Sequence, residues 1–206
     1  LMSPVIILVG IFGGFVTPTE AAALAVLYTM CISTFFYKTM PWKQFPRMVI
    51  NAGVTAGTIL LVAMTASVAT YIFAVDQLPA KVSALLLGIS TSPYIVMLLM
   101  GLIFIVIGMF LDITAAILLV TPVLMPTALQ VGVDPIHFVV FMVMSLSVGL
   151  STPPVGVCLF ATSLVSKLKI ETIVRSSWPF YSIIAVFLVV LALVPDIVLL
   201  IVKLLL

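Results

Sequence analysis

Charged residues are scarce in this 206-residue chain. Only 8 Lys or Arg and 6 Asp or Glu are present, 7% of the sequence, whereas hydrophobic residues make up 65%. Soluble globular domains carry about 25% charged residues, so this composition excludes an ordinary soluble domain. The net charge of +2 is too small to indicate a nucleic-acid partner. The composition instead predicts an all-α membrane protein with several helices that cross a lipid bilayer.

Residues that bind metals or nucleotides are also scarce. The chain has 1 His and 2 Cys, and Cys31 and Cys158 lie far apart in apolar segments. This set predicts neither a disulfide nor a zinc-type site. No GxxxxGK[ST] motif occurs, which argues against direct use of ATP by this chain. The first residues are apolar and lack a basic region or a cleavage signal, so we expect the chain to begin inside a longer protein.

Charges and prolines divide the sequence into apolar segments. Short pieces lie at residues 4–15 and 78–89, and the second predicts a short helix that lies at the membrane interface and starts near Pro79. Four longer segments predict membrane spans: residues 17–36, 48–75, 138–164 and 180–206.

Basic residues gather in two loops, at residues 38–47 and 167–175. Both loops should face the cytoplasm under the positive-inside rule, which requires an even number of crossings between them. Aromatic residues flank the loops as an interfacial belt would: Tyr37 and Trp42 beside the first, Trp178 and Tyr181 beside the second.

Residues 94–129 should then begin and end on the outer side of the membrane. Two full spans or one re-entrant hairpin would satisfy this condition equally well. Each arm is shorter than the roughly 20 residues that a full helical crossing takes, which favours a hairpin. Its turn would carry the polar residues Asp112 and Thr114.

The most informative segment is residues 145–156, SLSVGLSTPPVG, inside a stretch from residue 135 to 166 that has no charged residue. Pro153 and Pro154 donate no N–H, so the carbonyls of Gly149 and Leu150 lose their i+4 partners. Lipid offers these oxygens no donor, so such a break must be buried in protein or line a watery cavity. Freed carbonyls and hydroxyls suit a hard cation, and the N-terminus of a second half-helix suits an anion. The segment therefore predicts the binding site of a secondary transporter.

Several polar residues fit helix starts. Thr17 and Glu20 form a predicted capping box around Pro18, and a second role of Glu20 near an ion path stays open. Asp134 precedes a proline at a second predicted start, and His137 close to it is predicted to be structural or interfacial instead of a proton carrier. We also expect a hydroxyl residue of the break, Ser151 or Thr152, to cap the second half-helix.

Asp112 lies between two long uncharged segments. It fits the N-cap of a helix that begins at Ile113. However, an Asp at membrane depth costs about 2.5–3.5 kcal/mol on insertion scales and is usually functional, so a second role beside a cation stays open. Gly108, four residues earlier, would permit close approach of a neighbouring backbone.

Five motifs together are specific for one family: residues 15–23 (FVTPTEAAA), 108–112 (GMFLD), 121–126 (TPVLMP), 132–137 (GVDPIH) and 149–156 (GLSTPPVG). In this order they resemble the C-terminal half of the large membrane (M) subunit of tripartite ATP-independent periplasmic (TRAP) transporters. The resemblance covers essentially the whole chain. Where the family usually has leucine-leucine-threonine-proline-proline, residues 150–154 read LSTPP, which adds a hydroxyl at the break.

The resemblance implies an elevator-type transporter built from two inverted repeats, of which this chain holds about one. The expected fold is a multi-span helical bundle with a re-entrant hairpin and a discontinuous helix. It implies three parts: residues 1–92 with scaffold-type spans and the interfacial helix, residues 93–166 with the transport-type hairpin and broken helix, and residues 167–206 with a cytoplasmic loop and the final span. The expected location is the bacterial inner membrane, crossed several times.

The implied function is sodium-coupled import of a small organic anion, such as a C4-dicarboxylate, and not enzymatic catalysis. Sodium would be the coupling ion, and no cofactor is expected. The implied partners are a small membrane subunit, a periplasmic substrate-binding protein, the N-terminal half of the same permease, the organic anion and the lipid bilayer, with no nucleic acid.

The implied site residues lie at the hairpin tip and at the break. Those at the tip are Gly108, Asp112 and Thr114. Those that would contact sodium or substrate at the break are Ser147, Gly149, Leu150, Ser151 and Thr152, with sodium held through oxygen atoms of Gly149, Leu150 and Thr152. Those that would keep the helix broken are Pro153, Pro154 and Gly156.

Three other functions compete with this interpretation. A dicarboxylate or citrate sodium symporter that needs no binding protein would have a similar architecture. An intramembrane hydrolase would need a nucleophile and a base, and only Ser151 and His137 could pair, about 21 Å apart along a continuous helix. A purely structural membrane subunit is the third alternative.

Overall fold

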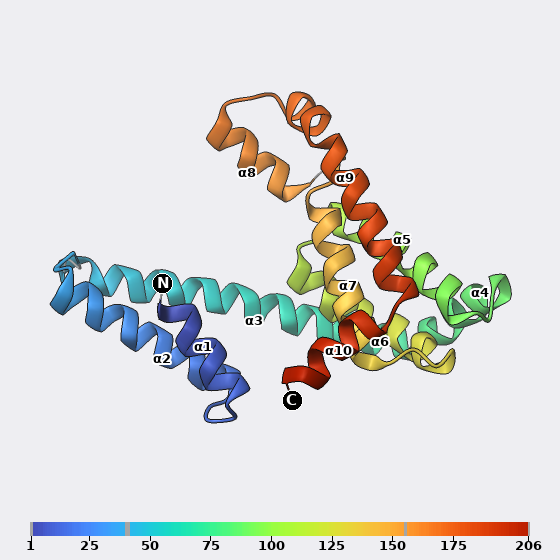
Figure 1. Ribbon diagram of the computed structural model, residues 1–206, viewed down its shortest axis with the longest axis horizontal. Helices are drawn as coiled ribbons and strands as arrows, with labels where there is room; N and C mark the ends of the chain where they lie inside the picture. Colours follow the sequence, from blue (N-terminus) through green and yellow to red (C-terminus); the bar gives the residue numbers. More distant parts are fainter. Residues whose placement is uncertain (1, 40–41, 155, 206) are drawn as a thin grey trace. The chain divides into compact units, whose positions relative to one another are not determined.

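The computed structural model describes residues 2–39, 42–154 and 156–205 (Figure 1). All regular structure in these ranges is helical, and no strand occurs there. In the same ranges, five helical segments are long and apolar enough to cross a bilayer: Pro18–Phe36, Trp42–Val75, Pro93–Phe110, Ile113–Gln130 and Ile170–Leu193. The all-α membrane fold expected from the composition is therefore confirmed.

The chain divides into two compact units. One comprises Leu1–Thr58 and Val202–Leu206, and the other comprises Ile59–Ile201. The boundary falls within the long helix α3 (Phe45–Val75). The three functional parts expected from the resemblance, residues 1–92, 93–166 and 167–206, are a different kind of division and stay a prediction.

The first unit contains α1 (Met2–Phe12), α2 (Pro18–Cys31) and the start of α3, with a π-helical turn η1 (Ile32–Phe36) and a 3-10 turn η2 (Trp42–Gln44) between α2 and α3. The start of α2 has the expected capping box. The backbone N–H of Thr17 donates to the Glu20 carboxylate (2.8 Å), and the N–H of Glu20 donates to the Thr17 hydroxyl (3.4 Å). Two N–H groups that lack helical partners are thereby satisfied.

The core of the second unit lies between α5 (Pro93–Phe110) and α7 (Pro135–Leu150), which pack more extensively than any other pair of helices. Phe104 is fully buried against the rings of Phe138 and Phe141, with centroids 5.8 and 6.4 Å apart. Such edge-to-face ring pairs stabilise more than their buried area alone. These rings lie at the centre of the buried core of the second unit.

Three further helices surround this pair. α6 (Ile113–Gln130) packs on α5 and α7, α4 (Leu78–Ile89) packs on α6, and α9 (Ile170–Leu193) packs on α5 and α7 (Figure 1). The bounds of α4 agree with the predicted short helix at residues 78–89.

Acidic side chains begin two of these helices, as predicted. The Asp112 carboxylate accepts the Thr114 N–H (2.9 Å) at the start of α6. The Asp134 carboxylate accepts the N–H of Ile136 (2.8 Å) and of His137 (3.3 Å) at the start of α7. These caps fix where α6 and α7 begin.

The predicted last span at residues 180–206 is wrong at both ends. α9 begins at Ile170. Glu171 and Arg175, which we expected in a loop, therefore lie on its exposed first turns. It ends at Leu193, and α10 (Asp196–Leu205) is a separate helix. Pro195 separates them, since it lacks an N–H and disfavours a helical conformation at the residue before it.

Candidate functional site

The helix that carries the double proline is broken. α7 ends at Leu150, and α8 (Val157–Ser166) begins after Gly156. The end of α7 tightens into i+3 hydrogen bonds: the Ser151 N–H donates to the Val148 carbonyl (3.1 Å), and the Thr152 N–H donates to the Gly149 carbonyl (2.9 Å). We call residues 151–156 the break. Its position agrees with the prediction made from Pro153 and Pro154.

Two carbonyls at the end of α7 differ in their hydrogen bonding. As expected, both Gly149 and Leu150 lack an i+4 partner, but the Gly149 carbonyl accepts an i+3 bond from the Thr152 N–H (2.9 Å). The residues at i+3 and i+4 from Leu150 are Pro153 and Pro154, joined by a cis peptide bond, and neither has an N–H. The prolines therefore deprive Leu150 of both possible helical donors.

The expected cap of the second half-helix is wrong. The N-cap of α8 is Gly156, with φ 55° and ψ 80°, and no side chain caps it. Glycine suits this left-handed conformation because it has no Cβ. The hydroxyl of Thr152 donates instead to the Val148 carbonyl (2.7 Å), and that of Ser147 donates to the Val143 carbonyl (2.7 Å). Both hydroxyls thus bond to carbonyls of α7.

Two glycines bring the end of α5 against the end of α7. A Cβ on Gly108 would lie 2.5 Å from the Leu146 carbonyl oxygen and 3.2 Å from the Gly149 Cα. A Cβ on Gly149 would overlap the Ile105 carbonyl and lie 2.8 Å from the Gly108 Cα. Only glycine at both positions lets the backbones touch in this way. The expected close approach at Gly108 is present.

A hydrogen bond links the same helix end to the break. The N–H of Gly156 donates to the carbonyl of Met109 (3.3 Å), and Gly156 itself is buried. Gly149 lies just before the break and Gly156 is its last residue, so α5 contacts both ends of the break. The structure therefore brings Gly108, Gly149 and Gly156 together.

Asp112 and Thr114 do not join this contact. Both are exposed, and among the hydrogen bonds of the described residues none connects either of them to the break. The structure shows Asp112 as a helix cap at the turn between α5 and α6. A role beside a cation stays a prediction for both residues, as do the sodium and substrate contacts expected at the break.

Tyr181 was missed as a site residue. We expected an interfacial aromatic residue, but its side chain is half-buried and its hydroxyl donates to the Ser151 carbonyl (2.6 Å). Pro154, at i+3 from Ser151, has no N–H. The sequence shows that this carbonyl has no i+3 donor, but not that α9 supplies one.

A comparison with known protein families identifies the family of this chain. Residues 1–197 match the family described as "Tripartite ATP-independent periplasmic transporter, DctM component". The chain belongs to the DctM family.

Named relatives agree with the DctM match. The chain is 37% identical over 197 residues to an isethionate TRAP transporter permease protein of Oleidesulfovibrio alaskensis, covering 96% of this chain and 31% of the relative. It is 35% identical over 200 residues to the 2,3-diketo-L-gulonate TRAP transporter large permease protein of Escherichia coli, covering 97% and 47%. It is 32% identical over 195 residues to a C4-dicarboxylate TRAP transporter large permease protein of Pseudomonas aeruginosa, covering 95% and 46%. The chain thus spans a third to a half of the length of these relatives.

DctM membership confirms three expectations. The family recognised from the five motifs is correct, and it is a family of transporter permeases, not of enzymes. Members are integral inner-membrane proteins, and the five membrane-length helices in the described ranges agree with that location.

His137 in this DctM chain is structural, as predicted. Its side chain is buried, with Nε2 2.7 Å from the Leu191 carbonyl. The residue at i+4 from Leu191 is Pro195, so the imidazole stands where a helical N–H is missing. His137 lies in the first turn of α7, and Ser151 lies just after its last turn. The two residues are therefore at opposite ends of α7 and cannot act together as the base and nucleophile of a hydrolase.

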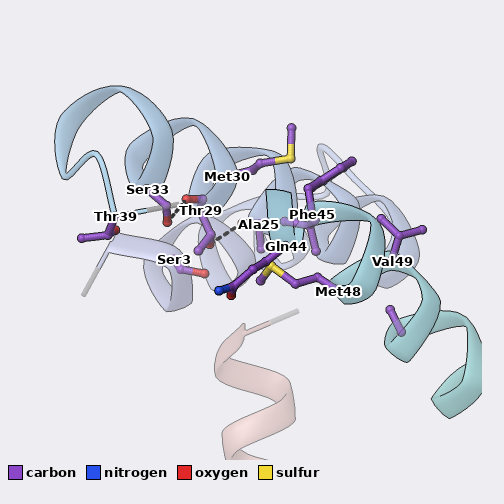
Figure 2. A pocket seen from close by; sticks show the side chains of 12 residues that line it. Ser3, Ala25, Thr29, Met30, Ser33, Thr39, Gln44, Phe45, Met48 and Val49 are labelled. Atoms are coloured by element: carbon purple, nitrogen blue, oxygen red, sulfur yellow. Dashed lines mark hydrogen bonds between the residues drawn. The ribbon is translucent and has the colours of Figure 1, made fainter. Parts of the chain in front are cut away.

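Two cavities of the chain lie away from the break. The larger, about 720 Å³, lies in the first unit and is mainly apolar, with side chains such as Ala25, Met30 and Phe45 (Figure 2). The hydroxyls of Thr29 and Ser33 on its wall donate to backbone carbonyls of their own helix (2.7 Å each). A cavity of about 210 Å³ lies beside Asp134 and His137, at the opposite end of α7 from the break. None of the predicted site residues lines either cavity. Neither cavity brings hydrogen-bonding atoms together as the break does.

Proposed function

We propose that this chain forms part of the large permease subunit of a TRAP transporter that imports a small organic anion together with sodium. The observation that supports the proposal best is the break held against the end of α5. It lies within a stretch, residues 135–166, that has no formal charge. Irregular backbone in such a stretch is tolerated only where protein or a water-filled cavity satisfies it.

The oxygen atoms at the break suit sodium. Sodium would contact the carbonyls of Gly149 and Leu150 and the hydroxyl of Thr152. The two prolines deprive Leu150 of helical donors, and the Gly149 and Thr152 oxygens keep lone pairs beyond their present hydrogen bonds. All three are neutral oxygen donors, which suit a hard cation that must also be released.

An organic anion suits the start of α8. The first turn of α8 has no acidic residue, and its N-terminal N–H groups carry the positive end of the helix dipole. Relatives of the chain are named for isethionate, 2,3-diketo-L-gulonate, C4-dicarboxylate and sialic acid, which all carry negative charge at neutral pH. Ser147 and Ser151 are the proposed polar contacts beside these N–H groups.

The alignment of α5 and α7 supports a re-entrant hairpin. Gly101 faces Phe141 and Gly108 faces Gly149, so the two helices run in the same direction and α5 ends level with the break. α8 has 10 residues and continues about 15 Å further. The turn at Asp112 would therefore stop inside the bilayer. With the other half of the permease supplying an inverted repeat, this unit would move as the transport part of an elevator.

The proposed partners follow from the same family. A small membrane subunit would support the permease, and a periplasmic substrate-binding protein would deliver the anion. Sodium and the anion would bind at adjacent loops, so each would raise the affinity for the other by one shared coupling free energy.

Uptake by the reconstituted full-length permease tests this function. With the small subunit and the binding protein present, an inward sodium gradient should drive uptake of a labelled organic acid, and an equal potassium gradient should not. Sodium-independent uptake would contradict the coupling. Sodium-driven uptake without the binding protein would instead favour the symporter that works alone.

A further inference from the structure

Two side chains tie α7 to α9, one at each end of α7. The Tyr181 hydroxyl donates to the Ser151 carbonyl (2.6 Å), and the His137 ring lies 2.7 Å from the Leu191 carbonyl. For Leu191, the residue at the α-helical i+4 position is Pro195, which has no N–H; for Ser151, Pro154 at i+3 has none, so no 3-10 bond can form there. A distant side chain thus hydrogen-bonds a backbone carbonyl at each end.

Only the first of these ties reaches the break. Ser151 lies between Leu150 and Thr152, whose oxygen atoms are proposed sodium contacts. A peptide unit is planar, so fixing the Ser151 carbonyl also fixes the N–H of Thr152, which belongs to the same unit. That N–H bonds the Gly149 carbonyl (2.9 Å). One hydroxyl on α9 therefore restrains the orientation of the sodium-site backbone.

We propose that Tyr181 is a positioning residue of the sodium site, and this proposal rests on the function proposed above. Its hydroxyl holds the break in the conformation that presents the oxygens of Gly149, Leu150 and Thr152. A bound cation requires those oxygens in one arrangement, and a preformed arrangement lowers the cost of binding. Without the hydroxyl, the Ser151 carbonyl is free to turn toward water or toward the cation.

The Tyr181→Phe substitution tests this role, because it removes the hydroxyl and keeps the ring. In the reconstituted permease with its partners, we expect the half-saturating sodium concentration for uptake to rise about three- to tenfold, the change expected for one net hydrogen bond. The maximal rate and the melting temperature should change little. The sodium concentration that gives half-maximal thermal stabilisation of the purified permease provides a second measurement that does not depend on uptake.

Two matched variants separate positioning from general structure. His137→Leu removes the other tie between α7 and α9, and it should lower the melting temperature while the half-saturating sodium concentration stays at the wild-type value. Tyr71→Phe removes a hydroxyl from an exposed tyrosine of α3, and it should change neither quantity.

Each outcome decides the proposal. A wild-type sodium curve for Tyr181→Phe overturns it, and so does an equal shift in His137→Leu. A loss of melting temperature in Tyr181→Phe without a change in sodium half-saturation would show a merely structural role. If the unmodified permease transports without sodium, the proposed function fails first and the role of Tyr181 falls with it.

Discussion

Gly108 and Gly149 show how single residues position this site. Neither residue has a Cβ, so the backbones of α5 and α7 can touch at these positions. This backbone contact sets how near the end of α5 comes to the break. A methyl group at either position must displace backbone rather than a flexible side chain, and such overpacking is costly.

Gly108→Ala should therefore destabilise the permease by about 1–3 kcal/mol. Its Cβ would lie 2.5 Å from the Leu146 carbonyl oxygen. The melting temperature of the purified full-length permease measures the effect. Gly88→Ala is the control, since a Cβ there meets nothing within 4 Å and alanine favours a helix. Equal melting temperatures for the two variants would contradict the close contact.

Asp112 allows its capping role to be separated from its charge. Asp112→Ala should weaken sodium-dependent uptake, because loss of the cap costs about 0.5–2 kcal/mol at the start of α6. Asp112→Asn should keep uptake near wild type, since asparagine caps as well as aspartate. Uptake rates of the two variants at limiting sodium provide the comparison. A similar loss in both would show that the negative charge itself acts on the cation.

At the residue scale, the sequence predicted what depends on neighbours in the chain. The caps at Thr17, Asp112 and Asp134 follow from local spacing, and the structure has all three. Tyr181 could not be found in this way, because its partner Ser151 lies 30 residues away on another helix. Only packing of α9 against α7 brings them together.

At the scale of elements, the break depends on two consecutive prolines. They remove both helical donors of the Leu150 carbonyl, and α7 ends at that residue. A single proline would leave one donor and give a kink, whereas this pair ends the helix and leaves room for the left-handed Gly156 before α8.

Pro154→Ala should raise the sodium concentration required for half-maximal uptake. The alanine N–H would stand at i+4 from Leu150 and could bond its carbonyl, so a proposed sodium contact would be lost to the extending helix. Pro79→Ala is the matched control, because Pro79 lies in the first turn of α4, where proline is tolerated. An unchanged sodium curve for Pro154→Ala would count against the Leu150 carbonyl as a contact.

The elements themselves were predicted unevenly. The break, α4 and the starts of α6 and α7 follow from prolines and acidic caps. The extent of α9 did not, because Glu171 and Arg175 suggested a loop although they lie on exposed helical turns, and because Pro195 was placed inside a span that it ends. Charge alone cannot separate a loop from the exposed end of a long helix.

At the scale of the whole molecule, the sequence predicted the family and the membrane fold but not the packing that orders the second unit. The even number of crossings required between the two basic loops allowed residues 94–129 to be either two full spans or a re-entrant hairpin. The parallel alignment of α5 with α7 favours the hairpin, because α5 stops level with a break inside a charge-free stretch. That alignment depends on Gly101 and Gly108, whose partners on α7 are not evident from the sequence.

Cysteine labelling in sealed membranes tests the hairpin. With Cys31 and Cys158 replaced by serine, Leu168→Cys in the loop after α8 should react with a bulky, membrane-impermeant maleimide from the cytoplasmic side. Leu111→Cys at the turn between α5 and α6 should not react from that side, because a re-entrant turn stops about 15 Å short of the far end of α8. Val131→Cys, after α6, should react from the outer side only. If Leu111→Cys reacted from the cytoplasm as fast as Leu168→Cys, α5 and α6 would be two full spans and the hairpin would be wrong.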